Sequence, residues 1–167
     1  MNVLPYDELP AFPTEISATN TIARLVDGLA FRYRWATEDL TENFMQFKPV
    51  ESSMSAGEVM YHIYNLAFSA NRTFGGNPEH DKTTRSLEEL RTQTLGLYHD
   101  LSLRLRSMQD DELALSVENN PKGFPFWFWL NGPIADALTH VGQITSWRRM
   151  DGNPQPTGVN VFLGKKS

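Results

Sequence analysis

The stretch SLEELRTQTLGLYHDLSLRLRSM, from Ser86 to Met108, carries the cleanest apolar stripe in the chain. Its apolar side chains, interrupted only by Thr94, recur every three or four residues: Leu87, Leu90, Leu97, Leu101, Leu105 and Met108. That spacing places them on one face of an α-helix. Ser86 and Glu89 form a capping box at its start, in which each side chain satisfies a free backbone amide. The stretch therefore predicts a long amphipathic helix with one buried face.

Two earlier stretches carry the same kind of signal. The first predicted helix runs from about Asn20 to Leu40, and the second from a capping box at Ser55 and Glu58 to about Phe74. The residues Gly75-Gly76-Asn77-Pro78 stop the second helix. The expected core-facing side chains are Ile22, Leu25, Val26, Leu29, Tyr33 and Ala36 in the first helix, and Val59, Ile63, Leu66, Ala70 and Phe74 in the second.

A fourth helix is predicted to start at Asn131-Gly132-Pro133, with the proline in its first turn, and to end near Met150. The link before it, residues 110–123, is expected to be irregular, and its length leaves the topology open. Four amphipathic helices predict an all-α four-helix bundle. Residues 1–167 then form a single domain, with an N-terminal extension (1–18) and an extended C-terminal tail (152–167).

Some side chains fall outside the predicted core faces. Phe31 and Trp35 lie on another side of the first helix and are either at the rim of the core or on a partner surface. The fourth helix has a face of mostly small residues, which is exposed or makes a close-packing contact: Ala135, Thr139, Gly142, Ser146 and Arg149. Either surface is a candidate contact for a homodimer, which is the expected oligomer.

The composition excludes several classes of function. A net charge of -5 disfavours nucleic-acid binding, and the pairs Arg148-Arg149 and Lys165-Lys166 are too short to form a basic stripe. The chain has 0 cysteines, so any metal ligands must be histidine or carboxylate side chains. No apolar run approaches the roughly 18 residues of a membrane helix, and the N-terminus lacks the pattern of a signal peptide. A cytoplasmic location is expected.

The 4 histidines differ in their surroundings. His80 lies in a polar loop, and His99 lies away from the leucine stripe of its helix, so both are expected to be solvated. His62 falls on the flank of its core stripe, and His140 points inward or toward a cleft. Asp136 precedes His140 by one helical turn, a spacing that stacks the two side chains and suits a metal site.

Other interpretations of these residues stay open at this point. Asp136 and His140 are also explained as a helix-stabilising pair, and His62 as a hydrogen-bonded residue at the edge of the core. The aromatic run from Phe126 to Trp129 either packs in the core or walls an apolar pocket over the site.

Two segments carry a resemblance to a known family. MSAGEVMYHI (54–63) and DALTHVGQI (136–144), the latter followed by Arg148-Arg149 and Gly152-Asn153-Pro154, resemble the motifs of the DinB-like family of metal-binding proteins. The resemblance implies a four-helix bundle in up-down-down-up order. It also implies a divalent metal held by His62, Asp136 and His140, although the family commonly has histidine where this chain has Asp136. Gln143 matches a frequent family residue, which either hydrogen-bonds a ligand or lies on the surface.

The resemblance also implies a function. Zinc or nickel is the expected ion, and the expected activity is that of a thiol S-transferase or a hydrolase acting on a small molecule. Because the chain has no cysteine, a thiol nucleophile must arrive as a low-molecular-weight cosubstrate. The alternative is a non-catalytic ligand-binding or interaction protein on the same bundle, with a degenerate metal site.

Overall fold

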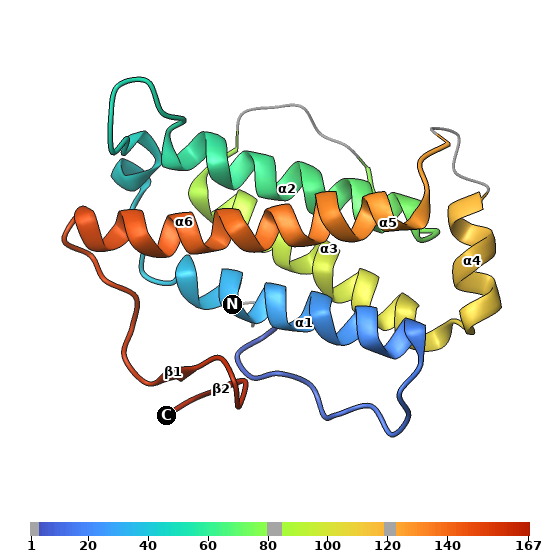
Figure 1. The fold of residues 1–167 in the computed structure, drawn as a ribbon. Helices are drawn as coiled ribbons and strands as arrows, with labels where there is room; N and C mark the ends of the chain where they lie inside the picture. Colours follow the sequence, from blue (N-terminus) through green and yellow to red (C-terminus); the bar gives the residue numbers. More distant parts are fainter. Residues whose placement is uncertain (1–3, 80–84, 119–122) are drawn as a thin grey trace.

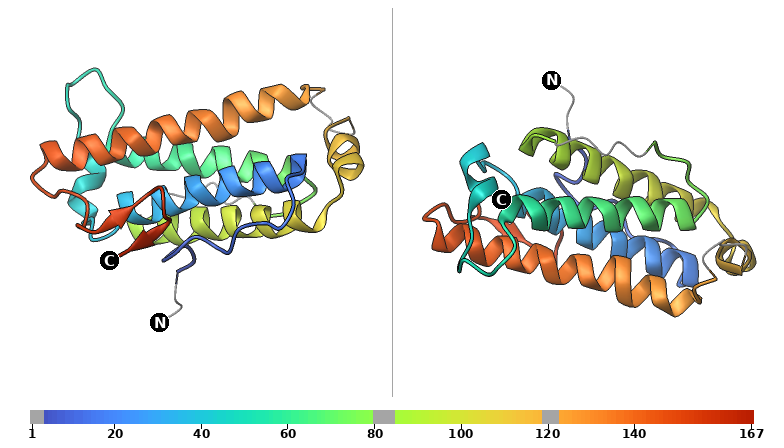
Figure 2. Two further views of the ribbon diagram at one scale, coloured as in Figure 1. Left: turned by 60° about the horizontal axis from the view of Figure 1, so that its bottom comes forward. Right: turned by 90° about the horizontal axis from the view of Figure 1, so that it is seen from above.

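A computed structural model of the chain describes residues 4–79, 85–118 and 123–167, and the fold in these ranges is mostly helical. Four long helices lie side by side (Figures 1 and 2): α1 (Ala18–Ala36), α2 (Ala56–Thr73), α3 (Leu87–Ser107) and α6 (Ala137–Met150). A short 3-10 helix, η1 (Glu42–Gln46), lies between α1 and α2. None of the helices in the described ranges is both long and apolar enough to cross a membrane.

The two predicted capping boxes are confirmed. At the start of α2 the Glu58 amide donates to Ser55 Oγ at 3.2 Å, and the Ser55 amide donates to Glu58 Oε2 at 2.7 Å. At the start of α3 the Glu89 amide donates to Ser86 Oγ at 3.2 Å, and the Ser86 amide donates to Glu89 Oε2 at 2.8 Å. These reciprocal bonds satisfy amides that have no partner within the helix.

The start of the fourth predicted helix is wrong. The chain is already helical at Phe126, and α5 (Phe126–Trp129) leads without a break through a π-helical segment, η2 (Leu130–Asp136), into α6. Pro133 lies inside the π segment rather than in a first turn. Proline lacks a donor and its ring clashes with the carbonyl four residues earlier, so a wider local turn accommodates it.

The link after α3 also differs from its predicted irregular form. Residues Asp110–Glu118 form a further helix, α4, at one end of the molecule (Figure 1). Asp110 there accepts hydrogen bonds from the Ala18 and Thr19 amides, at 3.2 and 3.0 Å, and so caps the start of α1 from another helix. The rest of the predicted irregular stretch, residues 119–122, lies outside the described residues.

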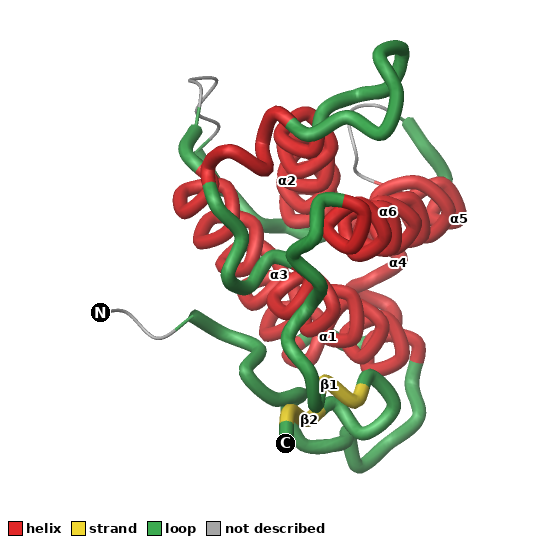
Figure 3. The backbone as a smooth tube through the Cα atoms, turned by 90° about the vertical axis from the view of Figure 1, so that its left-hand side faces the viewer, coloured by secondary structure: helices red, strands yellow, loops and turns green. Residues whose placement is uncertain are grey.

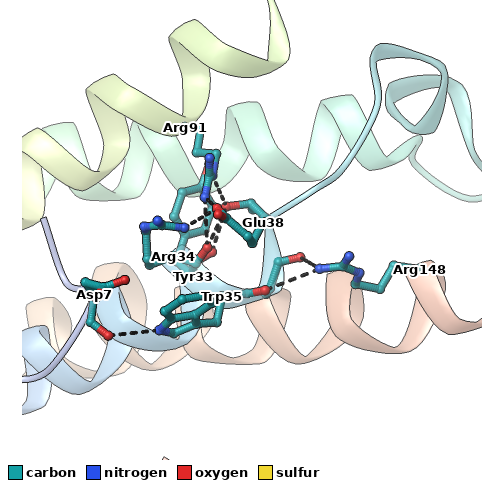
Figure 4. Close-up of polar contacts among 9 residues, drawn as sticks. Asp7, Tyr33, Arg34, Trp35, Glu38, Arg91 and Arg148 are labelled. Atoms are coloured by element: carbon teal, nitrogen blue, oxygen red, sulfur yellow. Dashed lines mark hydrogen bonds and ion pairs between the residues drawn. The ribbon is translucent and has the colours of Figure 1, made fainter. Parts of the chain in front are cut away.

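The core contains most of the predicted apolar faces, but the sides of α1 were assigned incorrectly. Leu25 is 42% exposed, whereas Phe31 and Trp35 are buried, so neither is a rim or partner-surface residue. The chain termini account for the burial of Trp35. Its indole nitrogen donates to the Asp7 carbonyl at 3.3 Å (Figure 4), and Lys166 Nζ lies 5.3 Å from the centre of the ring.

Among the residues that the structure describes, two charged side chains are fully buried. Asp27 of α1 accepts hydrogen bonds from Ser102 Oγ at 2.6 Å and from Tyr6 Oη at 3.2 Å, and it pairs with Arg106 of α3. Burial and the adjacent carboxylate raise the pKa of Tyr6 above its usual value, which keeps its hydroxyl a donor. These contacts join the N-terminal extension, α1 and α3.

Arg148 is the second buried charge, at 0% exposure, so the pair Arg148-Arg149 presents one exposed cation rather than two. Its guanidinium donates to the carbonyls of Trp35 and Ala36 at 3.2 and 3.0 Å, and to that of Asn153 at 2.7 Å. Figure 4 shows this contact beside the pairing of Glu38 with Arg34 and Arg91. Arg148 therefore satisfies carbonyls at the C-terminal end of α1 that have no partner within the helix.

The C-terminal tail forms a small antiparallel pair, β1 (Val159–Asn160) with β2 (Lys165–Lys166), which lies beside α1 (Figure 3). The predicted extended tail therefore contains a short strand pair. The amide of Leu9 donates to the carbonyl of Gly164 at 2.8 Å. Gly164 has a φ of 65°, and a Cβ there would lie 2.3 Å from Leu9, so only glycine fits this crossing of the two chain ends.

Candidate metal centre

Three predicted ligands come from two neighbouring helical segments. His62 lies in the second turn of α2, Asp136 is the last residue of η2, and His140 is in the first turn of α6. Helix α2 packs against both η2 and α6, which places the three side chains next to one another. All three are partly buried, at the edge of the core rather than inside it.

The carboxylate of Asp136 lies between the two imidazoles. Its Oδ2 is 3.0 Å from His62 Nε2, and its Oδ1 is 3.6 Å from His140 Nε2. The two rings meet edge to face, with centroids 4.8 Å apart. One ligand atom from each of the three residues can be chosen so that all of them lie within 4.8 Å of one another.

Two of the separations are close to those around a single metal ion, although they involve different oxygens of Asp136. Zinc–nitrogen and zinc–oxygen bonds of about 2.0 to 2.2 Å place neighbouring ligand atoms roughly 3.0 to 3.5 Å apart at octahedral to tetrahedral angles. The 3.0 and 3.6 Å separations of the Asp136 oxygens from the two nitrogens are close to that range. The shorter side chain of aspartate, compared with histidine, therefore still reaches the other two ligands.

Gln143 contacts the site through His140. The Nδ1 of His140 lies 2.8 Å from Gln143 Oε1, which accepts a hydrogen bond and cannot donate one. Nδ1 is therefore the donor to Gln143, and Nε2 is the ring nitrogen that faces Asp136. Of the two roles foreseen for Gln143, the structure supports the hydrogen-bonding one.

The cluster is open to solvent. The side chains of His62 and Asp136 are 39% and 42% exposed, and that of His140 is 19% exposed. A small molecule can therefore approach from the side of His62 and Asp136. Glu58, one turn before His62, is occupied elsewhere, because its hydrogen bonds to Ser55 at the helix start lower its pKa and hold the carboxylate there.

The remaining histidines do not join the cluster as far as the structure describes them. His99 is exposed on α3, with its ring edge to face against Tyr6, which agrees with the expected solvated position. His80 lies outside the described residues.

The aromatic run before the ligand helix is only partly in the core. Trp129 is buried and Phe126 packs partly against the core, but Trp127 and Phe128 are 68% and 41% exposed. Phe128 stacks on Phe124, with centroids 4.1 Å apart. Core packing therefore explains half of the run, and the other half forms an exposed aromatic surface at the end of α5.

Comparison of the chain with protein-family models, with curated proteins and with solved structures gives no match.

Proposed function

We propose that His62, Asp136 and His140 bind one divalent metal ion, zinc or nickel, and that the protein is a metal-dependent enzyme acting on a small molecule. The observation that carries the proposal is the placement of the Asp136 carboxylate, 3.0 and 3.6 Å from the two imidazole nitrogens. Two histidines and one carboxylate form a facial ligand set that leaves coordination positions open.

The DinB-like family is the proposed relationship. Its support is the order of the quoted motifs along the chain and the path of the chain in Figure 1, which reverses from α1 to α2, keeps its direction in α3, and reverses again in α6. That path agrees with an up-down-down-up four-helix bundle, to which α4 and α5 are additions.

The proposed reaction is thiol S-transfer or hydrolysis. A bound divalent ion supplies Lewis acidity, which lowers the pKa of a water or thiol and polarises an electrophile. The chain's own contribution is positional: Gln143 fixes the tautomer of His140, and the half-exposed Asp136 and His62 leave the site accessible. Since the chain has 0 cysteines, the thiol is a low-molecular-weight cosubstrate. We further propose that the protein is a homodimer, that it is cytoplasmic and that it does not bind nucleic acid.

A second candidate is a non-catalytic binding protein with a degenerate site. The 3.0 Å contact between His62 and Asp136 favours it, because the two side chains also satisfy each other as a hydrogen-bonded pair. The two candidates differ in whether an ion is held at all.

Elemental analysis of protein purified without an affinity tag separates them. One equivalent of metal is expected in the wild type, and much less in His62→Ala and His140→Ala. His99→Ala is the matched control, since that histidine is exposed on α3 and lies outside the cluster. Asp136→His should retain metal because it restores the residue common in the family. Unchanged metal content in both site variants would disprove the ligand assignment.

Cobalt substitution tests whether a thiol enters the site. The chain has 0 cysteines, so a sulfur-to-cobalt charge-transfer band in the near ultraviolet must come from an added thiol. Such a band is expected on titration with a small thiol and should be lost in His140→Ala. If cobalt binds but no small thiol produces the band, thiol S-transfer is excluded as the activity, and hydrolysis or non-catalytic binding remains.

A further inference from the structure

A groove opens on the side of α6 opposite the metal centre. An advance of about 100° per residue places Leu138 and Gly142 on the face of α6 that points away from His140. Leu138 and Gly142 line a cavity of about 320 Å³, and Leu138 also lines an adjoining cavity of about 530 Å³. The two cavities share Arg32 of α1, Leu138 and Val161 of the tail, so they form one continuous groove between α1, α6 and the chain ends.

Apolar side chains line this groove and remain open to water. Leu138 and Val161 form its centre, and Phe12, Leu25 and Phe162 at the larger cavity are 76%, 42% and 92% exposed. Exposed apolar side chains gathered around one groove are typical of a binding surface. Covering them gains about 25 cal/mol for each Å² of apolar surface removed from water.

The charge in the groove is of one sign. Arg24 and Arg32 line the larger cavity, and no aspartate or glutamate is among the residues lining either cavity. This local excess of positive charge stands out in a chain with a net charge of -5. Within the described ranges neither arginine pairs with a carboxylate, in contrast to Arg34, Arg91 and Arg106.

The two guanidinium groups are placed on the same side of α1. Arg24 and Arg32 are eight residues apart, with Gly28 midway between them, so all three lie along one face of the helix. Arg24 Nη1 donates to the Pro10 carbonyl at 2.8 Å, and Arg32 Nη1 donates to the Gly28 carbonyl at 2.9 Å. Each guanidinium has five donors, so most of its N–H groups remain available to a ligand.

We propose that this groove binds a linear fatty acid. The hydrocarbon chain packs along Leu138 and Val161, and the carboxylate accepts hydrogen bonds from Arg32 and Arg24. The cavities lie within the roughly 300 to 1,000 Å³ of typical small-molecule sites. Because α6 separates the groove from His62, Asp136 and His140, this binding does not depend on the proposed metal.

Titration calorimetry with decanoate, below its micelle concentration, tests the proposal. Decanoate should bind with one site per chain, decanol of the same chain length should bind about 10-fold more weakly, and decylammonium should not bind measurably. His62→Ala should bind decanoate like the wild type. Equal affinity for decanoate and decanol would overturn the assignment of the arginines.

A matched pair of variants places or omits a negative charge in the groove. A Cβ at Gly142 meets no atom within 4 Å, so both Gly142→Glu and Gly142→Gln should fold. The glutamate should weaken decanoate binding about 10-fold relative to the glutamine, because the two differ in charge and hardly in size. Arg32→Gln should weaken it similarly, whereas Arg72→Gln, at an exposed position on α2 that lines neither cavity, should not. Wild-type affinity in Gly142→Glu and Arg32→Gln overturns the proposal.

A second copy of the chain is the competing occupant of the groove. Sedimentation of the wild type with and without decanoate distinguishes the two. If the wild type is a dimer that does not bind decanoate, and Gly142→Glu dissociates it, then the groove is a protein interface. That outcome overturns the fatty-acid proposal. The fatty-acid proposal is supported if the wild type binds decanoate and its sedimentation coefficient is changed neither by decanoate nor by Gly142→Glu.

Discussion

Gln143 Oε1 accepts a 2.8 Å hydrogen bond from His140 Nδ1, and the opposite ring nitrogen faces Asp136. Removing the amide frees the ring to rotate and to protonate on either nitrogen. Gln143→Ala should therefore lower metal affinity about 10-fold, while Gln143→Glu should retain it, since it keeps an acceptor at this position. Competition with a chelating dye measures both, and equal affinity of wild type and Gln143→Ala would show that the contact does not orient the ligand.

Asp27 is the most completely buried carboxylate described, at 0% exposure, and it pairs with Arg106 and Ser102. Asp27→Ala leaves Arg106 without its partner at a site that water reaches poorly. The free energy of unfolding should fall by about 3 kcal/mol, measured by urea denaturation. Asp100→Ala, on the exposed side of α3, is the control and should change it by less than about 0.5 kcal/mol.

Arg148 and Arg149 are neighbours with opposite surroundings, which makes them a matched pair. Arg148→Met removes the donors to the Trp35 and Ala36 carbonyls and should cost about 2 to 3 kcal/mol of stability. Arg149→Met, at an exposed position, should be nearly neutral. Similar losses in the two variants would mean that the carbonyl contacts contribute little.

Asp110 makes the stability depend on pH at the acid end. Hydrogen bonds from the Thr19 and Ala18 amides lower its pKa below the usual 3.8. A carboxylate with a lowered pKa stabilises the fold fully above its usual value, and that stabilisation is lost as the pH falls through the folded-state pKa. The thermal midpoint of the wild type should therefore fall more steeply below about pH 4 than that of Asp110→Asn. Asp111→Asn should follow the wild type, because the Asp111 carboxylate accepts a hydrogen bond from the adjacent Glu112 amide and does not contact α1 in the described part of the chain.

Periodicity predicted the helices well because their cores are local in sequence. Val26, Leu29 and Tyr33 lie where the spacing places them. It failed for Trp35, which is buried because Asp7 and Lys166 cover it. Those contacts join residues far apart in the chain, and the spacing of apolar residues within one helix cannot predict them.

For the candidate site, too, the local pattern predicted single residues but not the contacts between distant segments. The positions of His62 and His140 on their helices singled them out among the histidines, but spacing alone did not pair them. Their pairing depends on α2 lying against η2 and α6, which came from the resemblance and not from any local pattern. The groove between α1, α6 and the chain ends was not predicted at all, because segments far apart in the sequence form it.

The π segment from Leu130 to Asp136 gives the site a tolerance of one-residue changes in chain length on its N-terminal side. A π turn contains more residues than an α turn, so it contributes a residue that a regular helix would lack. Deleting one residue between Leu130 and Pro133 would let the helix continue regularly, and would leave the Trp129 side in the core. Because the wider turn takes up that residue, Asp136 and His140 would keep about the same direction relative to Trp129 after the deletion. A deletion in the regular helix between Asp136 and His140, by contrast, would turn the two side chains apart by about 100°. The ligand spacing therefore depends on the regular turn after the π segment and not on the length of the π segment itself.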